Sequence, residues 1–288
     1  MSEQLRFDPE PLGTWTEETV FEVTAERLAQ YAEAVNDPIP AHRSGELANP
    51  VFAIVPVFES LLEPALGIVP LPLIGRIVHG EQDFRFHRPI VPGDKLTARA
   101  QMTGWESLPN GTRACVYLET RDAAGDPVNE QYVTFFVRGH DEGTRVGELA
   151  PGHRFDEALR AEAPVAATTQ HLDADQTFRY APAAGDPMPI HTDEEVARDA
   201  GLPGIIAHGL CTMAFTGWAA LTELADGDVR RLKRLAVRFA RPVVPDSDLD
   251  TRFWHAGSAD GITRYAYETH ARGELVIKDG LAEIADPA

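Results

Sequence analysis

The sequence predicts an α+β protein built from two copies of one module. The first observation is an internal repeat: residues 31–42 read YAEAVNDPIPAH, and residues 180–191 read YAPAAGDPMPIH. A second collinear pair follows, FHRPIVPGDKL from Phe86 and FARPVVPDSDL from Phe239. Two matches at nearly equal offset indicate a duplication of about half the chain. The second observation is order: in each half helical patterns come first and strands of alternating polarity follow, which is typical of an α+β fold.

Each half is expected to begin with a short strand and a capped helix. The strands are expected at Val20–Val23 and Val165–Gln170, and the helix N-caps at Thr24 and Asp173. These residue types accept hydrogen bonds from the free N–H groups of a first helical turn. An Asp-Pro turn ends each helix.

A further short helix is expected in the second half, directly after the turn. Thr192 and Glu195 have the spacing of a capping box, with Thr192 as the N-cap. A long apolar helix is expected next in each half.

The remaining strands have period-two character and are separated by turn signals. Hairpin turns are expected at Asn110-Gly111, Ala124-Gly125 and Asp260-Gly261. The predicted strands are Gln82–His87, Leu96–Trp105, Thr112–Arg121, Asn129–Arg138, Arg234–Arg241, Leu249–Ala256, Thr263–Ala271 and Leu275–Ile284.

The repeat divides the chain into a first module at residues 1–145 and a second module at residues 168–288. Residues 146–167 are rich in Gly, Pro and Ala and have no steady period. This composition predicts a linker between the two modules.

The second copy carries the residues with chemical potential. Asp186 stands five residues before His191, and His208 stands directly before Gly209. A helix is expected from Gly209, where a free N–H and the helix dipole favour a negatively charged oxygen. Carboxylate, imidazole and helix-start donor are the groups that adding water to a conjugated thioester requires. The apolar stripe of this helix is Leu210, Met213, Ala214, Gly217, Trp218 and Leu221.

This stretch resembles the signature of the MaoC-like dehydratases and (R)-specific enoyl-CoA hydratases. The family pattern reads roughly Y-x4-GD-x-NP-[IL]-H-x-[DE], with I-x-HG some fifteen residues on. Met188 replaces the family's usual Asn. The matching positions are Tyr180, Gly185, Asp186, Pro189, Ile190, His191, Asp193, Ile206, His208 and Gly209.

The resemblance implies a double hot-dog fold, in which each module wraps an antiparallel sheet around a central helix. It also implies reversible hydration of trans-2-enoyl thioesters to (R)-3-hydroxyacyl thioesters. Asp186 and His191 would hold and activate the water, and the Gly209 N–H would polarise the thioester carbonyl. Tyr180, Met188 and His208 would line or brace the substrate site. No metal or other cofactor is implied, and the family suggests a homodimer.

The first copy keeps Asp37 and His42 but has no His-Gly before its apolar run. By analogy with two-module hydratases, this module is expected to hold the acyl chain while the second performs the reaction. Because the oxyanion donor is missing, Asp37 and His42 are interpreted as turn geometry left over from the duplication.

Composition limits the partners. A net charge of −19 argues against binding to nucleic acid or to an anionic membrane. The anionic substrate, acyl-CoA or an acyl carrier protein thioester, would need local positive charge, for which Arg231 and Arg234 are candidates. Two cysteines, Cys115 and Cys211, exclude a disulfide scaffold and indicate a reducing compartment. With a polar N-terminus and no long uninterrupted apolar run, the chain is expected to be cytoplasmic and without a membrane span.

Two alternatives stay open. The chain could be an acyl-thioester binding subunit without activity, with Met188 marking a decayed site. It could also be an iron-dependent 2-oxoacid oxygenase, with His191, Asp193 and His255 as ligands and Arg264 on the 2-oxoacid. A serine hydrolase is disfavoured because the sequence has no G-x-S-x-G.

Overall fold

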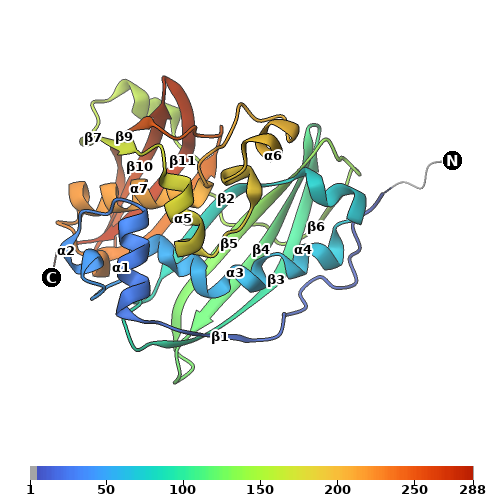
Figure 1. Ribbon diagram of the computed structural model, residues 1–288, viewed down its shortest axis with the longest axis horizontal. Helices are drawn as coiled ribbons and strands as arrows, with labels where there is room; N and C mark the ends of the chain where they lie inside the picture. The colour runs from blue at the N-terminus through green and yellow to red at the C-terminus, as the bar shows by residue number, and fades with distance from the viewer. Residues whose placement is uncertain (1–4, 288) are drawn as a thin grey trace. The chain divides into compact units, whose positions relative to one another are not determined.

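The computed structural model describes residues 5–287 and confirms an α+β chain of tandem hot-dog modules (Figure 1). The chain forms two compact units. Unit 1 holds the residues through Phe21, Pro56–Phe84 and Lys95–Gly152; unit 2 holds Glu22–Val55, Arg85–Asp94 and the residues from His153 onward. The helix and turn of the first repeat therefore cluster with the second repeat. The division at residues 145 and 168 itself stays a prediction.

Unit 1 is an antiparallel sheet with short helices packed on β3 and β4. Its strand order is β1-β3-β4-β5-β2, and β6 pairs with β3. The strands are β1 Thr19–Glu22, β2 Ile77–Phe86, β3 Lys95–Leu108, β4 Gly111–Arg121, β5 Pro127–Arg138 and β6 Arg145–Gly147, and the helices are α3 Phe58–Leu61, α4 Glu63–Ile68 and the 3-10 helix η2 Leu71–Arg76.

The single long helix expected in the first half is wrong. The segment begins as a 3-10 helix, η1 (Pro50–Val57), and continues as α3 and α4. Pro56 and Pro64 lie inside it. A proline removes one helical N–H and clashes with the carbonyl four residues earlier, so a continuous α-helix is interrupted here.

Unit 2 is a second antiparallel sheet, in the order β8-β11-β10-β9-β7, packed against one long helix. That helix, α7 (Gly209–Leu224), is buried along eleven of its sixteen residues. It is hydrophobic nearly all round, as a helix enclosed by a sheet must be. The strands are β7 Ala166–Leu172, β8 Leu232–Phe239, β9 Ser247–Ala259, β10 Ile262–Ala271 and β11 Glu274–Ala285.

The other helices of unit 2 are short and position the candidate site. The pair α1 (Ala25–Ala34) and α5 (Gln176–Ala184) are the equivalent helices of the two repeats. The remainder are α2 Pro40–Arg43, α6 Glu194–Asp199 and the 3-10 helices η3 Glu157–Ala161, η4 Pro189–His191 and η5 Val229–Arg231.

All ten predicted strands are present, with ends shifted by up to five residues. Turns are present at all three predicted places, at Ala123–Gly125, at Asp260-Gly261 and at Pro109-Asn110, the last one residue earlier than expected. A fourth hairpin turn, Arg272-Gly273 between β10 and β11, was not predicted, since both residues adopt positive φ angles of 51° and 79° and arginine rarely does so. The short strand β6 was also missed.

Of the predicted helix caps, Thr24 is confirmed: its side chain accepts a hydrogen bond from the Arg27 N–H. The caps expected at Asp173 and Thr192 are wrong. The helix α5 begins after Asp175, and α6 begins after Asp193, whose side chain accepts from the N–H groups of Glu195 and Val196. Asp173 instead accepts hydrogen bonds from Asn36 and Arg179.

Residues 153–165, inside the expected linker, are packed against the sheet of unit 2. Phe155 is buried edge-on against Trp254, with ring centroids 5.3 Å apart. Its N–H donates to the carboxylate of Asp279 at 3.0 Å. This segment is therefore an ordered part of the second module.

Unit 1 has the same arrangement. Phe7 packs on Trp105 at 5.4 Å, and its N–H donates to the Glu142 carboxylate at 3.0 Å. The duplication thus extends to a segment ahead of the first strand of each copy.

Residues Pro50–Ile68 are long and apolar enough to cross a membrane by length and composition alone, with a mean hydropathy of 1.7. Since 61% of this window is buried within the folded chain, it matches a core segment of a folded domain, and one such segment is weak evidence for a membrane span.

Candidate active site

The acid of the site, Asp186, is presented by the turn that ends α5. Gly185 closes the helix with a φ angle of +75°, a left-handed conformation that suits glycine. The Oδ1 atom of Asp186 then accepts a hydrogen bond from the Met188 N–H at 3.1 Å. Prolines 187 and 189 restrict the backbone on either side. The turn therefore fixes the carboxylate without help from the side chain of residue 188.

The histidine of the site, His191, is held by a backbone carbonyl across the cluster. Its Nδ1–H donates to the carbonyl oxygen of Ile206 at 2.8 Å. In the neutral ring this leaves Nε2 as the atom with a free lone pair. The side chain is only 8% exposed.

A second imidazole, His208, stacks on His191 with ring centroids 3.8 Å apart and planes inclined by 26°. One carboxylate oxygen of Asp186 and one nitrogen of each ring all lie within 4.8 Å of one another. Neither nitrogen of His208 makes a hydrogen bond of good geometry within the described chain. The three predicted polar residues are therefore brought together in one small cluster.

Burial controls the charge of this cluster. Desolvation raises the pKa of Asp186 above the ordinary range of a carboxyl, and desolvation lowers the pKa of His191. Burial lowers the pKa of His208 to about 3, and His191 beside it acts in the same direction. Both imidazoles are thus held neutral near pH 7, while the carboxyl is a stronger base than usual. These are properties of general acid-base sites.

Gly209 is the first residue of α7, next to this cluster in the chain. A first-turn N–H has no partner within its own helix, so it can donate to a ligand oxygen. A Cβ atom here would lie 3.2 Å from the Phe239 ring, tighter than ordinary contact. Glycine is consequently the residue that fits between the helix start and β8.

Tyr180 and Met188, both expected to line or brace the substrate site, differ in position. Tyr180 is fully buried behind the cluster, with its ring centroid 4.9 Å from that of His208. It braces the site rather than lining a surface. Met188 is 47% exposed at the mouth of the turn.

Arg231 and Arg234 pair with carboxylates that do not belong to this cluster. Arg231 donates to the Ala285 carbonyl and lies 3.3 Å from the Asp226 carboxylate. Arg234 is largely buried, 3.9 Å from Glu283. Carboxylates already compensate both charges, so the expected role in phosphate recognition stays a prediction with reduced physical support.

The first copy has the same turn, but its histidine is fully buried and bonded to the acid of the turn. The Ile39 N–H donates to Asp37 Oδ1 at 2.9 Å, as Met188 does to Asp186. However, His42 Nδ1 bonds to Asp37 Oδ2 at 2.7 Å, and the Asn49 side chain donates to the same oxygen at 2.8 Å. Both partners of the pair are 0% exposed. Here the acid and the histidine bond to each other, and the remaining His42 Nε2 is buried without a hydrogen-bond partner. In the second copy the His191 ring bonds to a backbone carbonyl and not to Asp186. Asn49 is the functional difference that the sequence analysis missed.

The iron-site alternative does not match the geometry. Asp193 is used as the N-cap of α6, and His255 is hydrogen-bonded to Ser258 on an exposed part of β9. The cluster of possible ligands found in the described residues contains Asp186, His191 and His208 instead. The ligand set expected from the sequence is therefore not the set of residues that the fold brings together. The expected absence of a metal stays a prediction that chelation would test.

Two family profiles match the chain. One, described as a MaoC like domain, matches residues 153–273; the other, described as a FAS1-like dehydratase domain region, matches residues 11–131. Together they cover both repeats, and the first contains the whole candidate site.

Similar proteins of known name agree with these profiles. A 3-hydroxyacyl-thioester dehydratase Y from Mycobacterium tuberculosis is 28% identical, over 97% of this chain and 99% of its own length. A probable enoyl-CoA hydratase 2 from Dictyostelium discoideum is 27% identical over 72% of this chain and 70% of its own. Among solved structures, a MaoC-like dehydratase from Phytophthora capsici superposes with a TM-score of 0.82 at 23% identity, covering 99% of this chain and 97% of that one.

Proposed function

Because this chain belongs to the MaoC-like dehydratases, we propose that it reversibly hydrates trans-2-enoyl thioesters to (R)-3-hydroxyacyl thioesters, in fatty-acid or related acyl metabolism. The observation that carries the proposal is the buried cluster of Asp186, His191 and His208 next to the start of α7. It provides a carboxylate with a raised pKa, an imidazole with a free Nε2 and an adjacent backbone donor.

In hydration, water lies between the Asp186 carboxylate and His191 Nε2. Asp186 removes a proton from the water as the water oxygen adds to the β carbon. The same proton passes from Asp186 to His191 Nε2, and His191 delivers it to the α carbon. The Gly209 N–H donates to the thioester oxygen, where the enolate charge develops. Dehydration follows the same steps in reverse.

The finer assignments are part of the proposal. The thioester carrier is coenzyme A or an acyl carrier protein, both of which present a phosphopantetheine arm to the site. We place the enzyme in the cytoplasm as a homodimer, since the cysteines are free and buried and the family suggests that assembly. A panel of C4 to C16 enoyl-CoAs, followed at the absorbance of the conjugated thioester, tests the activity and defines the chain length. Size measurement in solution tests the dimer.

The product should be the (R)-3-hydroxyacyl thioester. Asp186 and His191 lie on one short turn, so water and proton are delivered from the same side of the double bond. The Gly209 N–H fixes the thioester carbonyl, and this decides which face of the double bond meets the turn. Coupling hydration to dehydrogenases specific for each hydroxyacyl enantiomer measures the product. Turnover with only the S-specific enzyme would refute the stereochemical assignment, and a racemic product would show that the water is not held as described.

The variant Met188→Asn, which restores the family residue, should change kcat/KM little. The hydrogen bond that fixes the turn comes from the backbone N–H of residue 188, and the side chain is half exposed. Met188→Leu serves as the control for apolar contact. A rise of more than about tenfold in the Asn variant, worth roughly 1.4 kcal/mol, would show that the natural site is impaired. A non-catalytic acyl-thioester binding subunit would then become the better assignment.

A further inference from the structure

The first repeat reaches the candidate site through its helix α1. In unit 2, α1 lies beside the equivalent helix α5 (Figure 1). Tyr31 and Tyr180 occupy the same position in the two repeats, and their hydroxyl oxygens are 3.1 Å apart in a hydrogen bond. Both side chains are fully buried. The duplicated tyrosines therefore meet each other at the centre of the helix pair.

From Tyr180 a continuous line of rings leads to the reacting histidine. Tyr180 packs on His208 at a centroid distance of 4.9 Å, and His208 stacks on His191 at 3.8 Å. In the described residues the Asp186 backbone lies near the His208 ring but makes no hydrogen bond of good geometry with it. The Tyr180 and His191 rings pack against His208 and restrict its tilt, so a shift of Tyr180 would pass to His191.

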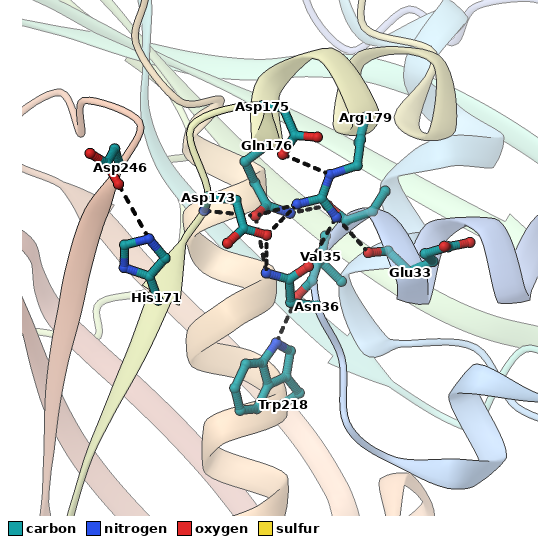
Figure 2. A network of polar contacts seen from close by, with 11 residues as sticks. Glu33, Val35, Asn36, His171, Asp173, Asp175, Gln176, Arg179, Trp218 and Asp246 are labelled. Carbon is teal, nitrogen blue, oxygen red and sulfur yellow. Dashed lines mark hydrogen bonds and ion pairs between the residues drawn. The ribbon is translucent and has the colours of Figure 1, made fainter.

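Side chains of the second repeat anchor α1 at its C-terminus (Figure 2). Arg179 and Gln176, both on α5, donate to the carbonyl oxygens of Glu33 and Ala34. Trp218 on α7 donates to the carbonyl of Val35 at 3.0 Å. The last carbonyls of a helix lack their usual partner four residues on. Three consecutive carbonyls at the end of α1 thus accept hydrogen bonds from the second repeat, and that of Glu33 also accepts from the Asn36 N–H.

Asn36 completes this anchor. It adopts a left-handed φ of 51°, the counterpart of Gly185 in the other copy, and its side chain bonds to Arg179 and Asp173. Helix α1 is thus fixed at one end by a polar network and at its middle by the Tyr31 hydroxyl.

We propose that Tyr31 is a positioning residue for His191, acting through Tyr180 and His208. The first repeat, whose own Asp-His pair is sealed, thereby supports the reaction of the second. The inference rests on the proposed function. Tyr31 touches no reacting group. Its hydroxyl fixes the depth and tilt of the Tyr180 ring, and the Tyr180 ring in turn fixes the planes of the stacked His208 and His191 imidazoles. The titratable groups around His191 are Asp186 and His208, with Tyr180 behind His208.

The test is Tyr31→Phe with Tyr267→Phe as the matched control. Both tyrosines are fully buried in unit 2 and bond through one hydroxyl, but Tyr267 meets Thr216, at 3.4 Å, and not the ring line. For Tyr31→Phe we expect kcat to fall roughly tenfold, because displacing a general acid-base group by a fraction of an ångström lowers the rate steeply. KM should stay within about twofold, and the acidic limb of the kcat/KM pH profile should shift. The control should show neither change at an equal melting temperature.

A double-mutant cycle with Tyr180→Phe makes the test specific. Removing either hydroxyl breaks the same bond, so the double variant should be no slower than the slower single variant. Additive losses, or a Tyr31→Phe enzyme as active as the Tyr267→Phe control, would overturn the inference.

A failure of the proposed function can be recognised separately, because the wild-type protein would then show no hydratase activity. In that case the histidine ring-proton NMR signals decide. The His191 signals should move in Tyr31→Phe and stay in place in Tyr267→Phe; unchanged signals in both variants would overturn the positioning role.

Discussion

Asp186→Asn and His191→Ala should each lower kcat/KM by about 10²–10⁴-fold, the contribution typical of a general acid-base group. The amide that replaces the Asp186 carboxylate cannot take a proton from water. The alanine that replaces His191 removes the only ring nitrogen left free by the hydrogen bond to Ile206. Steady-state assay of enoyl-CoA hydration measures the loss. Activity within a factor of about three of wild type in both variants would contradict the assignment.

Stability provides the control for Asp186→Asn, and its sign follows from the pKa of the carboxyl. Burial raises that pKa, so the folded state favours the protonated form. The charged carboxylate therefore costs stability once the pH rises above the unfolded pKa of about 3.9, and it costs nothing well below it. We expect Asp186→Asn to melt at or above the wild-type temperature at pH 7, with the difference vanishing below about pH 3. A variant that loses activity and also melts much lower would point to a structural role for Asp186.

The same shifts predict an acidic limb in the activity profile. Protonation of Asp186 removes the base, and protonation of His191 removes the Nε2 lone pair. Burial raises the pKa of Asp186 and lowers that of His191, so the two titrations move toward each other from their ordinary values. Hydration should therefore be lost as the pH falls and retained around pH 7.

Local patterns were sufficient to predict the strands, the turn of Asp186 and the start of α7, because each depends on a few neighbouring residues. Alternating polarity sets a strand, and a glycine with an Asp-Pro step sets this turn. The place of α1 in unit 2, beside α5, could not be predicted in this way. It depends on Arg179, Gln176 and Trp218 reaching carbonyls some 140 or more residues away in the chain. No local pattern records such a contact.

Two predictions differ from the structure for different reasons: the continuous long helix of the first half and the linker between the modules. Pro56 and Pro64 were visible in the sequence, but the apolar composition of the segment favoured one long helix. Proline restricts the backbone whatever the surrounding hydrophobicity. Residues 153–165 have no period because they form neither helix nor regular strand over most of their length. They are nonetheless ordered by Phe155 against Trp254 and by Arg160 on the buried Glu268 carboxylate.

The sealed pair of the first copy also changes the expectation for its variants. From the sequence, Asp37→Asn and His42→Ala should leave turnover nearly unchanged, because that module has no His-Gly donor. The structure adds an effect on stability, since Asp37, His42 and Asn49 form a fully buried hydrogen-bonded group. Removing one partner of such a group leaves a buried carboxylate with fewer bonds and a cavity where the ring was.

His42→Ala should therefore lower the free energy of unfolding by about 3 kcal/mol, the upper end for a hydrogen bond to a charged group. In a chain of this size that corresponds to a drop of roughly 6–12 °C in melting temperature. Turnover per folded molecule should stay within about twofold of wild type. His171→Ala is the control: His171 bonds to Asp248 at 2.8 Å in the same Asp-His geometry but at an exposed site, where screening by water makes the pair weak. Its melting temperature should hardly move. A His42→Ala enzyme that melts like the control would show that the buried pair does not form. A His42→Ala enzyme that stays folded but loses as much turnover as His191→Ala would show that both copies carry a working site.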